Sequence, residues 1–339
     1  MSFSWVEYCQ YLLSSQTNFT ITHLAEHLKS VSHDTIRRFL LSTELGTEQI
    51  WNNIQFEIEI DENGFIIFDD SVLDKSSSEA IELAKRLYSG NEHRVIMGIG
   101  IISCIYVNSR TGEFWLIDYR IYNPSEDEKT KNDHVMDMLN DLVTKKNIPF
   151  RTILTDCWYS SQRLMAEIDN LGKIYYCPLK VNRLIDDSQG VEKYKRIDQL
   201  SWSETEERKG KLIKIRGFPR DKKVKLFRVT MTEHRTEYVA TNDLNQENLE
   251  ATKTICRVRW KIEEFHREIK QLTGIEHCQC RKSRIQRNHI ACALLVWTHL
   301  KRLARQMQKT VYQLKQGLLS GYLTEQLHIP SIPMKLIHI

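Results

Sequence analysis

The chain has 339 residues, of which 41% are hydrophobic and 27% charged, and its formal net charge is +4 at pH 7. This length is sufficient for a large hydrophobic core and predicts two or three folded units. The sequence has neither a secretory signal pattern nor an apolar run of about 18 residues, which argues against secretion and against a membrane-spanning helix. Its eight cysteines are spread widely, a pattern typical of reduced thiols in a cytoplasm.

Residues 1 to about 55 are predicted to form a small helical unit. Apolar residues recur with helical spacing in 21–28 and again in 34–41, with a short polar break between the two segments. The pair is compatible with a helix-turn-helix in which Arg37 and Arg38 face the major groove of DNA. Two amphipathic helices are equally typical of a packing or dimerisation module.

From Phe65 onward the pattern indicates alternating strands and helices. A Gly-containing turn at 108–112 predicts a hairpin between the second and third strands. The expected strands are 65–71, 94–107, 112–122, 151–156 and 173–180, and the expected helices are 133–146 and 161–168. The chain is therefore predicted to be an α/β protein with the order three strands, helix, strand, helix, strand.

Two of these strands end in acidic residues. The strand that begins at Phe65 ends in Asp69 and Asp70, and the strand that begins at Arg151 ends in Asp156. Open α/β sheets bind ligands at the carboxyl ends of their central strands, so both positions are candidate site residues. Each aspartate, taken alone, also fits a residue that caps the following turn or helix.

The segment 181–249 is predicted to be a β-rich insertion. It contains three short strand-like runs, 211–216, 224–231 and 236–241, separated by turn residues at 217–221 and 233–235. Basic residues are concentrated in two segments, with ten Lys or Arg against one acidic residue in 208–228 of this insertion, and with 14 against 4 in 251–309 beyond it. Such local excess suits a phosphate-binding surface, although a solvated basic face has the same composition.

The stretch from Cys256 to Lys270 is predicted to be one amphipathic helix. At about 100° per residue, Arg259, Glu263 and Lys270 fall within about 40° of each other, whereas Glu264 lies about 100° further around. An apolar stripe lies roughly a third of a turn away and comprises Val258, Ile262, Phe265, Ile269 and Leu272. The alternative is an ordinary surface helix whose charges serve solubility.

The order strand-Asp69, strand-Asp156, helix-Glu263 resembles the DDE transposases of bacterial insertion sequences. Within them it is similar to the group marked by Tyr-x2-Arg-x3-Glu-x6-Lys on the last catalytic helix. The pattern here reads Cys256-x2-Arg259-x3-Glu263-x6-Lys270. The only difference from the family pattern is Cys256, which replaces the leading Tyr. The similarity extends over about 56–310.

The resemblance implies a ribonuclease-H-like mixed-sheet core in which the strands of Asp69 and Asp156 are neighbours. That core would comprise 56–180 and 250–310, interrupted by the β-rich insertion 181–249 and followed by a C-terminal tail, 311–339. The implied cofactor is a pair of Mg²⁺ ions, or Mn²⁺ in their place. Asp69 would bridge the ions, Asp156 would bind one or both, and Glu263 would bind the other.

The resemblance also implies double-stranded DNA as partner, both transposon ends and target, and a homodimer that processes two ends together. The protein would then act at the bacterial nucleoid. Arg259 and Lys270 suit backbone phosphates near the cut. Trp158 and Trp260 are candidates for stacking on an unpaired base or, alternatively, for the core. Lys75 and Tyr159 are further candidates for positioning the strand.

Three alternatives accompany this interpretation. One is a transposase-derived DNA-binding protein that no longer cuts, for which the substitution at Cys256 leaves room. Another is a host nuclease with the same core, which would not carry out strand transfer. The third is a zinc site formed by His277, Cys278 and Cys280 with residues downstream, but its Cys-x-Cys spacing differs from that of common zinc sites.

Overall fold

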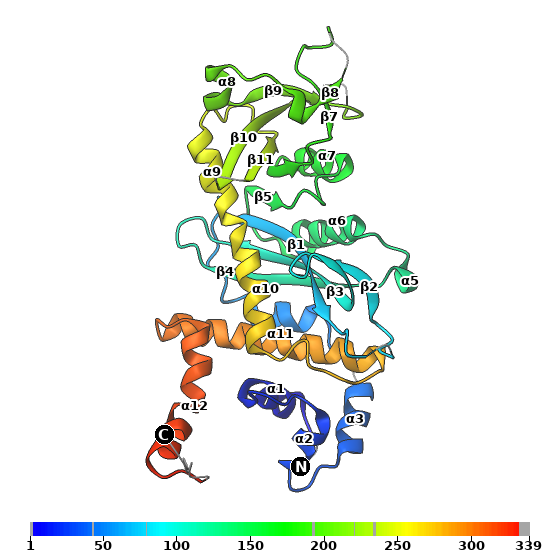
Figure 1. Ribbon diagram of the computed structural model, residues 1–339, viewed down its shortest axis with the longest axis vertical. Helices are drawn as coiled ribbons and strands as arrows, with labels where there is room; N and C mark the ends of the chain where they lie inside the picture. Colours follow the sequence, from blue (N-terminus) through cyan, green and yellow to red (C-terminus); the bar gives the residue numbers. More distant parts are fainter. Residues whose placement is uncertain are drawn as a thin grey trace, which may run out of the picture. The chain divides into compact units, whose positions relative to one another are not determined.

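The computed structural model describes residues 3–42, 44–78, 80–191, 194–219, 221–232 and 235–331. Parts of the turns expected at 217–221 and 233–235, and the end of the expected tail, lie outside the described residues. The chain forms two compact units (Figure 1). The first comprises Met1–Ile50, Ser77–Ala84 and Arg267–Ile339, and the second comprises Trp51–Ser76 and Lys85–His266.

The second unit begins with the end of α4 and closes with the beginning of α10. Its first half contains β1 (Phe65–Asp74), β2 (Lys85–Ser89), β3 (Arg94–Val107), β4 (Phe114–Tyr122), α5 (Pro124–Asp127), α6 (Lys131–Asp141), a π-helical turn (Leu142–Lys146), β5 (Thr152–Thr155), α7 (Gln162–Asn170) and β6 (Ile174–Leu179). Its second half contains β7 (Leu184–Asp186), β8 (Lys195–Arg196), a 3₁₀ turn (Ile197–Gln199), α8 (Glu204–Lys209), β9 (Lys211–Ile215), β10 (Val224–Thr232), β11 (Arg235–Thr241), α9 (Leu249–Val258) and part of α10 (Trp260–Leu272).

The core of this unit is a mixed sheet with the order β4-β3-β1-β5-β6. Strand β1 pairs antiparallel with β3 and parallel with β5, and β5 pairs parallel with β6. This is the order of a ribonuclease-H-like core, so the expected fold class and the neighbouring position of the two acid-bearing strands are confirmed. Strand β2, which pairs with the first part of β3, was not predicted, because its half-exposed alternating residues resemble a loop in the sequence.

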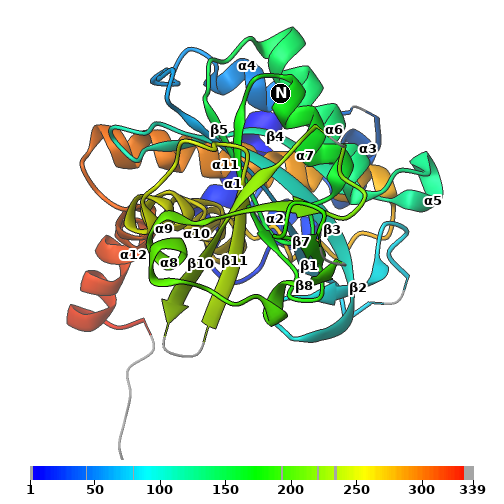
Figure 2. The same cartoon turned by 90° about the horizontal axis from the view of Figure 1, so that it is seen from above.

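The strands of the insertion continue the same sheet. Strand β11 pairs antiparallel with β6, and β10, β9, β7 and β8 follow in that order. Helix α9 packs against β10 (Figure 2). Without β11 the edge of β6 would present unpaired backbone groups. The insertion therefore completes the sheet beside the acid-bearing strands.

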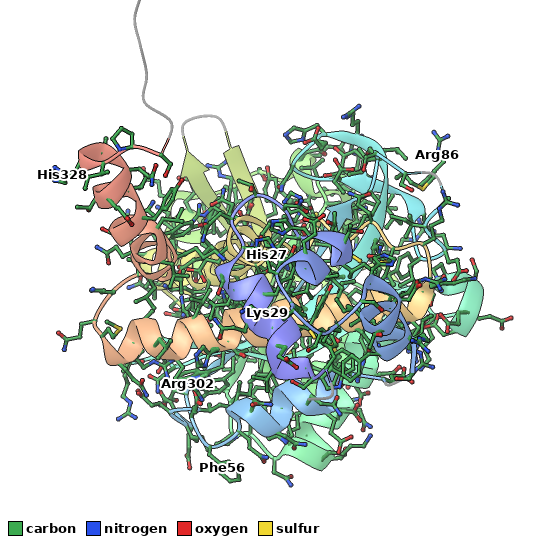
Figure 3. All side chains as sticks on the ribbon, turned by 90° about the horizontal axis from the view of Figure 1, so that it is seen from below. His27, Lys29, Phe56, Arg86, Arg302 and His328 are labelled. Atoms are coloured by element: carbon green, nitrogen blue, oxygen red, sulfur yellow. The ribbon has the colours of Figure 1, made fainter. Side chains whose placement is uncertain are left out.

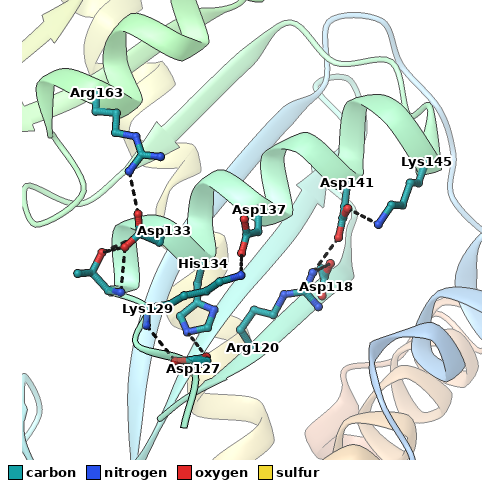
Figure 4. A network of polar contacts seen from close by, with 11 residues as sticks. Asp118, Arg120, Asp127, Lys129, Asp133, His134, Asp137, Asp141, Lys145 and Arg163 are labelled. Carbon is teal, nitrogen blue, oxygen red and sulfur yellow. Dashed lines mark hydrogen bonds and ion pairs between the residues drawn. The ribbon is translucent and has the colours of Figure 1, made fainter. Parts of the chain in front are cut away.

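Helices α6 and α7 pack on one face of the sheet. Their apolar residues share one cluster with Ile66 and Phe68 of β1 and with Tyr175 of β6. Thr130 and Asp133 form a capping box at the start of α6. The outer side of α6 carries ion pairs, among them Asp137 with Lys129, Asp141 with Lys145 and Asp133 with Arg163, at 2.6, 2.7 and 2.8 Å (Figure 4).

The first unit is helical. It contains α1 (Trp5–Ser14), α2 (Ile21–Glu26), α3 (His33–Ser42), the start of α4 (Thr47–Ile54), the end of α10, α11 (Ser283–Gln306) and α12 (Val311–His328). Helices α2 and α3 confirm the two expected helices, whereas α1 was not predicted. Helix α1 packs against α11, and the Tyr8 hydroxyl lies 2.9 Å from Nδ1 of His289. His27 and Lys29 are exposed (Figure 3).

The unit boundaries differ from those expected from the sequence, because 267–310 groups with the N-terminal helices. The reason is the buried face of α11, which packs against both α1 and α3. In the described ranges, every helix is too short or too polar to cross a membrane.

Candidate active site

The register of the sheet brings two of the three expected acids together. The parallel pairing of β1 with β5 runs from Phe65 opposite Thr152 to Phe68 opposite Thr155. Asp69 and Asp156 are the next residues on their strands. Since neighbouring strands lie about 4.8 Å apart, these two residues are adjacent at the carboxyl end of β5.

The alternation along β1 sends Asp69 and Asp70 to opposite faces. Asp70 accepts a hydrogen bond from the Tyr159 hydroxyl at 2.6 Å and from Lys131 Nζ of α6 at 2.5 Å. Asp69 lies opposite Ser103 of β3, and the Ser103 hydroxyl is 3.4 Å from Nε2 of His266 on α10. Asp70 is thus engaged on the α6 face, and Asp69 faces α10.

The environment of Asp69 is crowded with negative charge. Burial raises the pKa of Asp69 to about 8, and the carboxylates of Asp70 and Asp156 act in the same direction. The backbone N–H of Asp70, which donates to Oδ1 of Asp69 at 2.9 Å, acts against the rise. The backbone N–H of Cys157 donates to Asp156 in the same way. A buried carboxyl group whose pKa is raised by neighbouring carboxylates is typical of metal-binding and catalytic centres.

The segment expected to form one helix is divided at Arg259. Helix α9 ends at Val258 and α10 begins at Trp260. The Arg259 N–H donates to the carbonyl of Cys256, and the Ile262 N–H donates to the carbonyl of Arg259, both at 3.2 Å. These i→i+3 bonds tighten the chain at the junction. Arg259 still pairs with Glu263, four residues further on. Most of the expected apolar stripe is buried, namely Ile262, Phe265, Ile269 and Leu272.

Arg259 lies among four carboxylates. Its Nη1 is 3.5 Å from Oε1 of Glu263, and its Nη2 is 3.9 Å from Oε1 of Glu237 on β11. Burial lowers the pKa of Arg259, but the carboxylates of Glu237, Asp156, Asp69 and Glu263 outweigh burial and raise it. Glu263 therefore belongs to the same electrostatic cluster as the two aspartates. Glu237 was missed in the sequence, where its only signal is a charged residue in a strand-like run.

Both candidate tryptophans are on the surface rather than in the core. Trp158 follows Asp156 by two residues and is 64% exposed, and Trp260 follows Arg259 and is 50% exposed. The Lys180 ammonium lies 4.1 Å from the centre of the Trp158 ring, where the ring face attracts a cation. Two aromatic faces are thus available to solvent next to residues of the acidic cluster.

Other candidate residues occupy different environments. Lys75 and Tyr159 are 2% and 1% exposed, contrary to the expectation that they face DNA, because both pack into the interior. Lys270, in the part of α10 that belongs to the first unit, pairs with Glu276 at 3.5 Å. Arg37 and Arg38 are exposed on α3.

Among the residues that the structure describes, no three His, Cys, Asp or Glu side chains already converge as metal ligands. In the acidic cluster, Glu263 pairs with Arg259 instead. In the Cys/His segment, the His277 ring stacks on Phe19 with centroids 5.1 Å apart. Cys256, at the place of the family's Tyr, is 8% exposed. Burial, assisted by Glu237, raises the pKa of Cys256 to about 12.

Comparison with known proteins places this arrangement in a family. Residues 64–298, more than two thirds of the chain, match the Transposase DDE domain. The chain belongs to the transposase DDE domain family. The match contains Asp69, Asp156 and Glu263. It supports a transposase function for this DDE-domain protein, in agreement with the DDE transposase resemblance of the sequence. The search of curated proteins finds no match.

Solved structures extend the comparison of the fold. A piggyBac transposase synaptic complex with hairpin DNA has a TM-score of 0.50 and 9% identity, over 98% of this chain and 76% of that one. The Drosophila P element transposase strand transfer complex has a TM-score of 0.29 and 12% identity, over 50% of this chain and 36% of that one. An endonuclease V from Bacillus subtilis has a TM-score of 0.27 and 12% identity, over 77% and 92%. The piggyBac likeness concerns the fold alone.

Proposed function

We propose that this DDE-domain protein is an active transposase that cleaves DNA at transposon ends and joins the freed end to target DNA. The observation that carries the proposal is the sheet register that sets Asp69 beside Asp156, on the face covered by the α10 helix of Glu263. Both aspartates keep one carboxylate oxygen on a backbone N–H. In the proposal, the second oxygen of each carboxylate would bind a ligand.

The donor chemistry of the cluster fits Mg²⁺ or Mn²⁺. Three carboxylates supply the hard oxygen ligands that these ions prefer. The carboxylates of Asp70 and Asp156, which raise the pKa of Asp69 together with burial, favour a cation beside it. Asp69 would bridge two ions, Asp156 would bind one or both, and Glu263 would bind the other. Bound ions would activate water and stabilise the leaving oxygen. Glu263 must leave Arg259 to take part.

The reaction has two phosphoryl transfers. In the first, a water oxygen attacks a backbone phosphorus and the bond to the 3′ oxygen breaks, which leaves a 3′-hydroxyl and a 5′-phosphate. In the second, that hydroxyl attacks another phosphodiester and displaces its 3′ oxygen, so one bond forms for each bond broken. The chain would hold the phosphate in line with the attacking oxygen and stabilise the negative charge that develops in the transition state.

DNA binding rests on cations and exposed rings. Arg259 and Lys270 would neutralise phosphates near the cut, and Trp158 and Trp260 would stack on an unpaired base. Arg37 and Arg38 on α3 would approach duplex DNA at the transposon end. We further infer that the chain acts as a homodimer on two ends. The Arg259-x3-Glu263-x6-Lys270 pattern supports membership of the bacterial insertion-sequence group marked by that signature, which would place the protein at the nucleoid.

A Mg²⁺-dependent nicking assay on element-end DNA tests the proposal. The wild-type chain is expected to nick DNA and then produce strand-transfer products, and Asp156→Asn is expected to lose both while still binding DNA. Asp70→Asn is the matched control, because Asp70 lies on the opposite face, and it should retain cleavage.

Three other outcomes of the nicking assay would contradict the proposed function. Equal cleavage by Asp156→Asn and the wild type would refute the triad. DNA binding without cleavage by the wild type would indicate an inactive transposase-derived DNA-binding protein. Cleavage without strand transfer would indicate a nuclease.

A further inference from the structure

Arg259 is a cation that the fold has removed from water. The residue is 8% exposed, and its two terminal nitrogens point to different carboxylates, Nη1 to Glu263 at 3.5 Å and Nη2 to Glu237 at 3.9 Å. A guanidinium in such a place is strongly destabilising if it has no acidic partner. If Glu263 or Glu237 moves away from Arg259, the remaining carboxylate must therefore keep the buried guanidinium paired.

The two partners differ in origin and in enclosure. Glu263 is on α10, four residues from Arg259, and its side chain is 38% exposed. Glu237 is on β11, and its side chain is 11% exposed. Strand β11 pairs with β6 from Tyr238 opposite Leu179 to Thr241 opposite Tyr176. This register sets Glu237 next to the carboxyl end of β6, at the end of the sheet where β5 stops.

We propose that Glu237 is a positioning residue that holds Arg259 when Glu263 turns to bind a divalent ion. The inference rests on the proposed function, because it takes Glu263 as a ligand. When the Glu263 carboxylate binds a divalent ion, its ion pair with the Arg259 guanidinium is weakened. Glu237 is already within reach of the other nitrogen and is enclosed by the sheet, so it remains with Arg259 after the exchange.

The exchange gives the insertion a role at the acidic cluster. Glu237 belongs to the segment between the second and third acids of the triad, and β11 is the insertion strand that adjoins the core sheet. A substitution there would change how readily the cluster accepts an ion, although Glu237 touches neither the ion nor the substrate. Without Glu237, Arg259 would compete for Glu263 and weaken the binding of the ion.

Direct binding of Mn²⁺ tests the proposal. Calorimetric titration of the DNA-free protein with MnCl₂ gives the dissociation constant without reference to cleavage. Glu237→Gln is expected to raise that constant about tenfold, equivalent to about 1.4 kcal/mol. Asp187→Asn is the matched control. It removes another insertion carboxylate, which pairs with Lys195 at 2.9 Å and Lys211 at 3.2 Å, and should leave Mn²⁺ binding unchanged.

Two further variants test whether the charge of Glu237 acts on Mn²⁺ binding through Arg259. Glu237→Asp retains the charge on a shorter side chain and should raise the constant by a smaller factor, which tests the idea even if Glu237→Gln does not fold. In an Arg259→Gln background, Glu237→Gln should have little further effect, because Glu237 acts through Arg259.

Mn²⁺ binding by folded Glu237→Gln or Glu237→Asp at the wild-type constant would overturn the inference. A full further loss in the Arg259→Gln background would also overturn it, since Glu237 would then bind the ion itself. Glu263→Gln separates this failure from failure of the proposed function. If Glu263→Gln binds Mn²⁺ as the wild type does, the triad assignment fails. If only Glu263→Gln is impaired, the positioning role alone fails.

Discussion

Replacing Asp69 by Asn should stabilise the metal-free protein while it abolishes cleavage. Burial, together with Asp70 and Asp156, raises the pKa of Asp69 from 3.8 to about 8. The folded state therefore holds this proton more tightly than the unfolded chain does. The stability contributed by the protonated form is fully present below pH 4 and is lost as the pH rises through about 8. Asparagine is neutral at every pH and escapes that loss.

The magnitude follows from the same pKa. A rise from 3.8 to about 8 corresponds to an upper limit of about 5–6 kcal/mol, at about 1.4 kcal/mol for each pH unit. Because Asp69 is only half-buried, nearby water reduces both the cost of burying its charge and the repulsion from its neighbours, and we expect about 2 kcal/mol at pH 8. For a unit of this size, about 2 kcal/mol raises the melting temperature by roughly 4–8 °C.

Thermal unfolding in chelator, from pH 4 to pH 8, measures the effect. Asp69→Asn should melt with the wild type near pH 4 and above it at pH 8. Asp187→Asn is a control of opposite sign, because Lys195 and Lys211 outweigh burial and lower the pKa of Asp187. Excess Mn²⁺ should stabilise the wild type and not Asp69→Asn. A wild-type melting temperature that does not fall with pH, together with no gain in Asp69→Asn at pH 8, would contradict a raised pKa at Asp69.

Three other predictions concern the surroundings of the cluster. Tyr159→Phe removes the donor to Asp70 at 2.6 Å and should lower the free energy of unfolding in urea by about 1–3 kcal/mol; an unchanged urea midpoint would contradict it. Mn²⁺ binding should release close to one proton at pH 7 and almost none at pH 9, because Asp69 must ionise to bind the ion. Calorimetry in buffers of different ionisation enthalpy measures this release. Equal release at both pH values would exclude Asp69 as a ligand. Trp158→Ala should weaken single-stranded DNA binding by about 1–3 kcal/mol in fluorescence anisotropy, and unaltered affinity would show that the exposed ring does not stack on bases.

Much of the fold could be predicted because it depends on local pattern. The apolar runs that end in Asp69 and Asp156 indicated strands, and the spacing of Ile262 and Phe265 indicated a helix with one buried face. Helix α1 was missed although Ser4 and Glu7 have the spacing of a capping box. The break at Arg259 was missed because no Gly or Pro marks the junction in the sequence. The Arg259 backbone itself keeps helical angles.

Local patterns were enough to predict strands that carry acids and helices with one apolar face, because repeats of two and 3.6 residues can be recognised within a short segment. Which acids meet depends on the pairing of the strands. The pairing of β1 with β5 set Asp69 beside Asp156, and the pairing of β11 with β6 brought Glu237 to Arg259. Such pairings join segments far apart in the chain, and they depend on how the whole sheet packs rather than on any local period.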